Sequence, residues 1–298
     1  MKRIHQISIL TFALLVMIAC GPKQEAETEE TTNDAAVSEA FEQARDKFFT
    51  SIRQPDETAA SLMSIGADYN GELLYDPSKW STYTSSNEKS AALLGIYLSD
   101  LNYSIAYQQS DKTEALFEAI HALSLQIGVE KSILEYLMTR YKNNIAQNDS
   151  VQATMDEMYA NAIQSTRGTD REILTGIAIG THQVEDLHLM MGIIESYPKD
   201  MLPEDVRIQV LIPLFKTVLE EKSKLESVQA FLKTVIPAED ANNFYLTSFE
   251  KLINTYNELN VDEKIANNQG MELMRDEIIL KLNEQVTSIR NELIRTPQ

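Results

Sequence analysis

The chain has 298 residues, of which 43% are hydrophobic, and a formal net charge of −19 from 45 acidic and 26 basic side chains. The apolar share is sufficient for a sizeable core, and so negative a surface argues against nucleic acid as a partner because it repels phosphate backbones. With 10 glycines and 8 prolines, the chain lacks the turn residues that an all-β or α/β protein of this length needs.

The first twenty residues have the pattern of an export signal. Two basic residues, Lys2 and Arg3, precede an uncharged apolar run at 7–19. This run is too short to span the roughly 30 Å hydrocarbon core of a membrane as a helix, which favours a cleaved signal peptide over a transmembrane anchor. We therefore expect residues 1–19 to be a signal peptide.

The end of this segment indicates a lipid anchor. The sequence Met17-Ile18-Ala19-Cys20 resembles a bacterial lipobox, with Met17 in place of the usual leucine, and Cys20 is the single cysteine of the chain. We expect Cys20 to be the lipid attachment site, so that the protein contacts the membrane through acyl chains. The alternative is an ordinary secretory signal in which Cys20 is incidental.

Residues 20–36 have the composition of a tether. The sequence from Gly21 to Ala36, GPKQEAETEETTNDAA, is acidic and has no large apolar side chain, so it cannot bury enough surface to order itself. Its acidic run resembles the export tag that sends some Gram-negative lipoproteins to the outer surface, and a plain solvated spacer is the alternative. We expect the protein to be located in the cell envelope, at the outer membrane. The sequence leaves open which leaflet carries the anchor.

Segments of helical periodicity follow one another along residues 37–298, with no segment of sustained strand alternation, which predicts an all-α fold of about ten helices. We expect two stacked antiparallel bundles that divide near Gly168. Capping boxes at Ser85-x-x-Glu88, Asp111-x-x-Glu114, Thr169-x-x-Glu172 and Asn260-x-x-Glu263 predict four helix starts. Pro213 should kink or split its helix. The expected helices cover 37–52, 55–65, 86–109, 111–127, 130–146, 151–166, 169–196, a segment from 203, 237–259 and a last helix after 260.

Two stretches of the chain resemble a known set of proteins. These are YDPSKWSTYTSSNEKSAALLGIYLSDLNYSIAYQQ with ALFEAIHALSLQIGV, which lie within 69–129, and DREILTGIAIGTHQVEDLHL. Both are similar to segments of an uncharacterised family of helical lipoproteins from Gram-negative envelopes. The resemblance implies an envelope location and a helical fold. Because that family has no assigned activity, it implies no catalytic residue.

The segment Gly180-Thr181-His182-Gln183-Val184-Glu185 matches G-x-H-x-x-E, the pattern of imelysin-like proteins, which are helical envelope lipoproteins linked to iron handling. His182 and Glu185 share a helix face, so this resemblance makes them candidate metal ligands. Two ligands are too few for a protein metal site, and His188 lies roughly 120° around the helix. The alternative is a polar helix edge on which Asp186 pairs with His182. We expect no bound metal and no cofactor.

Three further features have a structural and a functional interpretation. Asp100 lies in a segment that is apolar almost all round, so it is either a site acid or a buried partner of a tyrosine hydroxyl, an indole N–H or a helix cap. The aromatic loop around Trp80, within 67–85, could stack a sugar or peptide, or act as a lid on the core. Gly176 and Gly180 predict close packing against a neighbouring helix.

The sequence as a whole favours a protein without enzymatic activity. It has no glycine-rich phosphate loop, no G-x-S-x-G and no H-E-x-x-H motif. Asp149-Ser150-Val151 resembles a short acceptor for envelope O-glycosylation. We expect a lipid-anchored helical envelope protein that binds a partner protein or supports assembly. The alternatives are an imelysin-like metal-associated protein and a small-ligand binder that uses the Trp80 loop.

Overall fold

The computed structural model describes residues 39, 42–48, 57–129, 135, 139, 165–198, 202–260, 263–264 and 277–295. Several predicted features lie outside these residues: the signal peptide, Cys20, the tether at 20–36 and the Asp149-Ser150-Val151 motif. Most of the two helices predicted at 130–146 and 151–166 also lies outside them. Residues 41–298 form one compact unit. The division into two bundles near Gly168 stays a prediction.

The part of the chain that the structure describes contains helices and no strand, which confirms the predicted all-α fold class. Within the same residues, no helix is both long and apolar enough to cross a membrane. The elements, in chain order, are α2 (Glu57–Ser64), the 3₁₀ helix η1 (Pro77–Tyr83), α3 (Asn87–Ala106), α4 (Ser110–Gln126), α7 (Glu172–Ser196), α8 (Glu204–Val235), the 3₁₀ helix η2 (Ala238–Asp240), α9 (Phe244–Glu258) and α12 (Glu277–Leu293).

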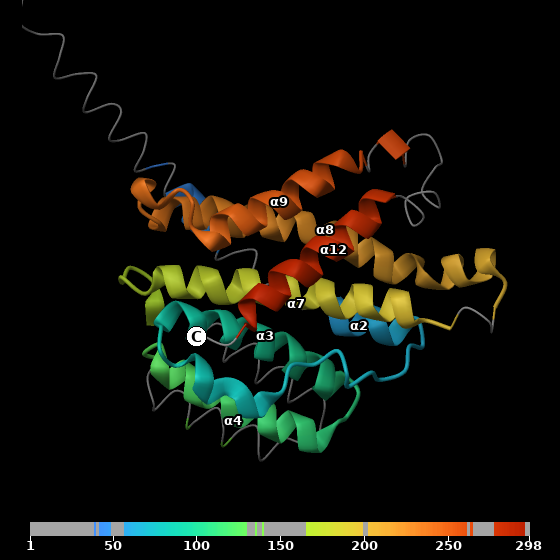
Figure 1. The fold of residues 1–298 in the computed structure, drawn as a ribbon, viewed down its shortest axis with the longest axis horizontal. Coiled ribbons are helices and arrows are strands. Elements are labelled where there is room, and N and C mark those ends of the chain that lie inside the picture. Colours follow the sequence, from blue (N-terminus) through green and yellow to red (C-terminus); the bar gives the residue numbers. More distant parts are fainter. Residues whose placement is uncertain are drawn as a thin grey trace, which may run out of the picture. The chain divides into compact units, whose positions relative to one another are not determined.

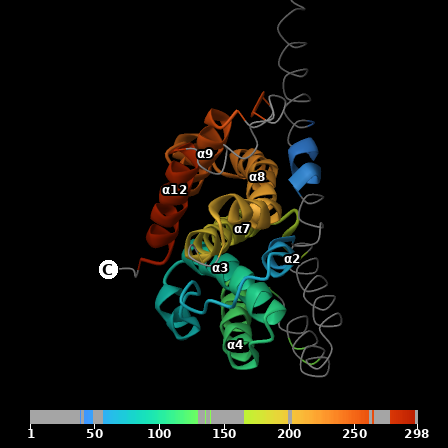
Figure 2. The ribbon, with the colours of Figure 1, turned by 90° about the vertical axis from the view of Figure 1, so that its right-hand side faces the viewer.

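Helix α7 lies at the centre of this unit (Figures 1 and 2). It packs against α3 on one side, with α4 beyond α3, and against α8 and α12 on the other side, where α9 joins them. A helix can take this position only if apolar residues surround it, and α7 is buried on every face. Its largest buried side chains are Leu174, Ile177, Ile179, Val184, Leu187, Leu189, Met190, Met191 and Ile193.

Glycines set the distance between α7 and its neighbours. A Cβ on Gly176 would meet Leu232 and Phe231 of α8, and a Cβ on Gly180 would meet Phe249 of α9. This confirms the close packing predicted for the G-x-x-x-G pair. On the opposite side of α7, Gly95 of α3 lies against the backbone of Ala178. α3 therefore approaches the backbone of α7 directly, whereas side chains of α8 and α9 pack against α7 at Gly176 and Gly180.

The aromatic loop before α3 is packed onto the core. Tyr69, Tyr75 and Trp80 are partly buried against the core, and Tyr83 is fully buried. The hydroxyl of Tyr97 donates to the carbonyl of Asp76 at 2.8 Å, and the hydroxyl of Tyr103 accepts from the backbone N–H of residue 70 at 2.8 Å. These contacts confirm that the loop packs onto the core, as its interpretation as a lid predicted. Part of it is regular, because Pro77 and the capping side chain of Asp76 start the short helix η1.

α3 and α4 begin within one residue of their predicted starts, and α7 begins three residues after Thr169, but the predicted capping residues are not the N-caps. α3 begins after Ser86, α4 after Gln109 and α7 after Arg171, and none of these N-cap residues makes a side-chain capping bond. α4 follows α3 after a reversal through Gln108, which has a positive φ of 56°. Thr169 accepts from the N–H of Arg171 at 3.2 Å, within a turn that precedes α7.

Of the two outcomes predicted for Pro213, a kink or a split, the split does not occur, because α8 continues through it from Glu204 to Val235. Buried Leu211, Leu214 and Phe215 hold the helix on both sides of the proline. Their packing outweighs the roughly 3 kcal/mol that a proline costs inside a helix. The single helix predicted over 237–259 is instead η2 followed by α9, because Asn243 caps α9 by accepting from the N–H of Tyr245 at 3.0 Å.

Candidate functional site

A buried charged cluster lies where α3, α7, α12 and the aromatic loop meet. Its side chains are Asp100 of α3, Glu185 of α7 and Arg290 of α12, with relative exposures of 0%, 0% and 8%. Charged side chains are rarely buried unless they are paired, so three of them at one junction make this the leading candidate for a functional site.

Arg290 and Glu185 form a forked ion pair. Nε of Arg290 donates to Oε1 and Oε2 of Glu185 at 2.9 and 2.7 Å, and Nη2 donates to Oε1 at 2.8 Å. The same Nη2 also donates to the carbonyl of Leu73 in the aromatic loop at 2.9 Å. Burial alone would lower the pKa of Arg290, but the charge and hydrogen bonds of Glu185 raise it above its ordinary value. The guanidinium therefore stays charged and ties three segments together.

Asp100 adds a second carboxyl group to the same cluster. Its Oδ2 accepts a hydrogen bond from the N–H of Tyr75 at 3.1 Å, while its buried Oδ1 accepts none. Burial raises the pKa of Asp100 well above its ordinary value, and the charge of Glu185 raises it further. Arg290 and the Tyr75 N–H act in the opposite direction without reversing the shift. Burial and the charge of Glu185 therefore both favour the protonated form of the Asp100 carboxyl group.

The burial and hydrogen bonding predicted for Asp100 are thus confirmed, but its partners differ from those expected. A backbone N–H of the loop replaces the predicted tyrosine hydroxyl, indole N–H or helix cap. His188 of α7 lies near this group and the backbone of Leu73. Burial lowers the pKa of His188, so the imidazole is neutral near pH 7 and supplies no second cation.

His182 belongs to a neighbouring set of polar side chains between α3 and α7. Its Nε2 lies 3.4 Å from Oδ2 of Asp186, and Ser99 of α3 donates to the other oxygen of Asp186. The predicted pairing of His182 with Asp186 is confirmed. The predicted polar edge is wrong, because Glu185 and Asp186 are buried and the side chain of His182 is only 12% exposed.

The two candidate metal ligands contact different partners. Glu185 is held by Arg290, whereas His182 is paired with Asp186. Among the described residues, no group of three or more His, Cys, Asp or Glu side chains is placed to hold a metal ion. The donor set at His182 and Glu185 therefore does not fit a metal, because a cationic side chain occupies the carboxylate that the site would need.

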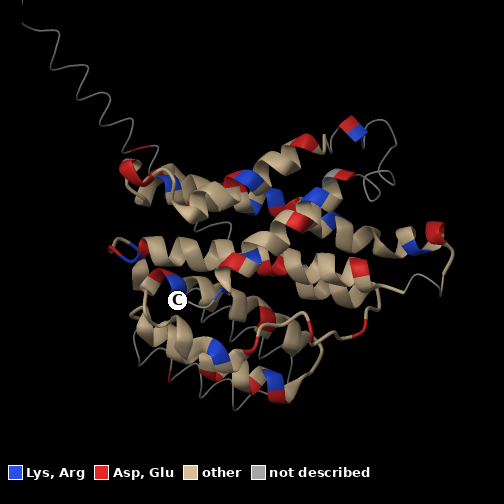
Figure 3. Cartoon of the chain, viewed as in Figure 1, with Lys and Arg blue, Asp and Glu red and all other residues tan. Residues whose placement is uncertain are grey.

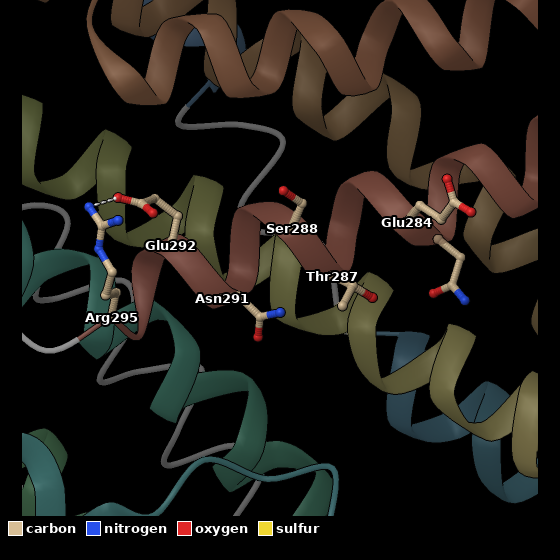
Figure 4. Close-up of a pocket in the computed structure, with 7 residues that line it drawn as sticks. Glu284, Thr287, Ser288, Asn291, Glu292 and Arg295 are labelled. Atoms are coloured by element: carbon tan, nitrogen blue, oxygen red, sulfur yellow. Dashed lines mark ion pairs between the residues drawn. The ribbon is translucent and has the colours of Figure 1, made fainter.

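A surface hollow of about 610 Å³ lies on the outer side of α12 (Figure 4). Its polar lining is exposed apart from the half-buried Asn283, and Arg295 forms an ion pair with Glu292 at 2.5 Å across its rim. A solvated polar helix face of this kind does not enclose a ligand or exclude water. The lining residues are Asn283, Glu284, Thr287, Ser288, Asn291, Glu292 and Arg295.

Sequence reasoning missed Arg290, although the chain contains a signal for it. Arg290 lies four residues after Val286 and three before Leu293, both of which are buried in the apolar stripe of the last helix. A cation at an apolar stripe position requires a buried anion, and Asp100 and Glu185 lie in helices that are apolar almost all round. Comparison with known proteins adds nothing to this assignment, since no family model, curated protein or solved structure matches the chain.

Proposed function

We propose that this protein is a lipid-anchored, non-enzymatic module of the Gram-negative bacterial envelope, whose helical body binds a partner protein or supports assembly. The observation that carries the location is the apolar run that ends in Met17-Ile18-Ala19-Cys20, with the chain's single cysteine at the cleavage position. The acidic tether that follows gives the helical body freedom to move away from the membrane surface.

The contacts of the candidate site residues support a binding role over catalysis. Glu185 and Arg290 pair with each other inside the core, where Asp100 is also buried, and Trp80 packs against that core as part of the loop. None of these side chains lines the surface hollow on α12. A reacting group must reach its substrate, whereas groups that join helices serve stability.

The surface charge indicates the chemistry of the partner. Acidic side chains are spread over the helices of the described part (Figure 3), and the whole chain carries a net charge of −19. Such a surface attracts a basic protein and repels anionic lipid headgroups. We therefore propose a cationic protein surface in the envelope as the partner.

The anchor is tested by Cys20→Ser. We expect this variant to accumulate as an uncleaved precursor, because the cysteine is the residue that is acylated before cleavage, and to yield no mature form that partitions into detergent. Detergent phase separation of whole-cell extracts measures both the size of the accumulated protein and its partitioning into the detergent phase. Thr31→Ser in the tether is the control and should be processed normally. A Cys20→Ser protein that is cleaved and stays in the membrane as before contradicts the proposal.

Partner binding is tested by crosslinking in intact cells that carry the wild-type protein. We expect a specific crosslinked protein with a basic surface. When the crosslinker is omitted, the amount of this partner that copurifies from solubilised membranes should fall as salt is raised, because salt limits the attraction between charges to distances of about 10 Å or less. The control is an unrelated helical domain fused to residues 1–36. Identical crosslinks from that fusion would attribute the contacts to the anchor and would contradict binding by the helical body.

A further inference from the structure

The cluster between α3, α7 and α12 contains two acidic side chains and one basic side chain. Two carboxyl groups, Asp100 and Glu185, share one guanidinium, Arg290, and all three are buried. If both carboxyl groups were ionised, one negative charge would stay buried without a counterion, which is a strongly unfavourable state. One bound proton removes that charge and lets the protonated carboxyl donate to its neighbour.

We propose that Asp100 and Glu185 share one buried proton, and that this proton acts as a latch: when bound it holds α12 and the aromatic loop against α3 and α7, and when it leaves they loosen. The inference concerns the folded body alone and does not depend on the proposed anchor or partner.

The contacts of the cluster explain why these two segments would respond together. Tyr75 of the loop binds Asp100 through its backbone N–H, and Leu73 of the loop binds Arg290 of α12 through its carbonyl. A second set of bonds joins the same segments: the hydroxyl of Tyr83 donates to the carbonyl of Ile294 at 2.5 Å and lies 2.7 Å from the hydroxyl of Tyr75. Loss of the proton would therefore act on the loop and on the last helix at the same junction.

The other titratable groups around Asp100 do not replace the proton. His188 of α7 is neutral near pH 7 because burial lowers its pKa, and burial raises the pKa of Tyr69 and Tyr75 in the loop and of Tyr97 on α3 itself. The pair of His182 and Asp186 lies on the adjacent turn of α7, where Ser99 contacts it. Arg290 is thus the single cation that faces the two carboxyl groups within the described residues.

The direction of the pH effect follows from proton linkage. The pKa of Asp100 is raised on folding, so between its ordinary value near 3.9 and its folded value the folded chain binds one proton more than the unfolded chain. The stabilisation is complete below the ordinary pKa and is lost as pH rises through the folded value. Across that window, the equilibrium constant for unfolding should rise by up to about tenfold per pH unit.

The test compares the full chain in detergent micelles with Asp100→Asn, in which the amide mimics the protonated acid. Urea unfolding is followed from about pH 5 to about pH 9 through Trp80, the single tryptophan, which lies in the loop. We expect the wild-type midpoint to fall with pH and the Asp100→Asn midpoint to change much less. Glu284→Gln removes an exposed charge from α12 and should keep the wild-type slope. Equal slopes in wild type and Asp100→Asn would overturn the proposal.

Two further measurements keep the proposal testable if Asp100→Asn fails to fold. Infrared spectroscopy of the wild type near pH 7 should show the C=O stretch of a protonated carboxylic acid that does not exchange readily with deuterium, and its absence would refute the shared proton. Amide hydrogen exchange, normalised to intrinsic rates at each pH, should show that residues 69–83 and 277–293 lose protection at high pH before α4 does. Simultaneous loss in all three segments would refute the latch.

Discussion

Arg290→Ala is expected to lower the free energy of unfolding by about 3–5 kcal/mol, as is usual when one partner of a buried ion pair is removed. The change leaves the carboxylate of Glu185 buried without a cation and the carbonyl of Leu73 without its donor. Urea unfolding followed by circular dichroism measures the loss. Arg295→Ala is the control, because Arg295 lies just beyond the end of the same helix with its side chain 69% exposed, and its ion pair should contribute less than about 1 kcal/mol.

A second substitution, Arg290→Lys, tests whether the forked hydrogen bonds stabilise the protein beyond the positive charge alone. Arg290→Lys keeps the positive charge but offers a single ammonium group in place of the planar fork, so it should lose a large part of the stability that Arg290→Ala loses. The double variant Arg290→Met with Glu185→Leu should recover much of the loss, because it removes both charges at once. If Arg290→Ala is within about 1 kcal/mol of the wild type, the ion pair does not hold α12 in place.

The sequence alone was sufficient to predict those features of the fold that depend on the local pattern of apolar and turn residues. Apolar periodicity predicted the fold class and the end of α7 at Ser196, and Gly66 and Gly128 were correctly predicted to end α2 and α4, where both have positive φ. The burial of Asp100 could be predicted because its helix has no polar face. In each case the information lies within one or two helical turns of the residue concerned.

The features that sequence reasoning missed depend on contacts between distant segments. Arg290 and Glu185 are separated by 105 residues, and a single sequence does not show which of its many acids a buried cation will meet. At Thr169 the predicted cap is displaced: its hydroxyl accepts from the N–H of Arg171, Glu172 accepts from the N–H of Gly168, and α7 begins only at Glu172. The split considered at Pro213 does not occur, because buried neighbours on both sides of it stabilise the helix through contacts that local pattern does not show.

The second large effect is expected from Gly95→Ala, at the crossing of α3 and α7. A Cβ at this position would overlap the carbonyl oxygen of Ala178 and the hydroxyl of Thr181. To accommodate it the helices must separate, which weakens the bond from Thr181 Oγ1 to the carbonyl of Ala92, now 2.9 Å. We expect a net loss of about 1–3 kcal/mol by urea unfolding, even though alanine favours a helix over glycine by about 1 kcal/mol.

The atoms that meet the new Cβ determine whether the effect reflects backbone packing. At Gly192 of α7 a Cβ would approach only the side chain of Leu73, at 2.6 Å, and that side chain is partly buried and able to rotate. Gly192→Ala should therefore cost less than Gly95→Ala or even stabilise the protein. Thr181→Ala should not rescue Gly95→Ala, because the carbonyl of Ala178 is backbone and stays in place. Full rescue by Thr181→Ala would mean that a side chain, not the backbone of α7, sets the distance between the two central helices.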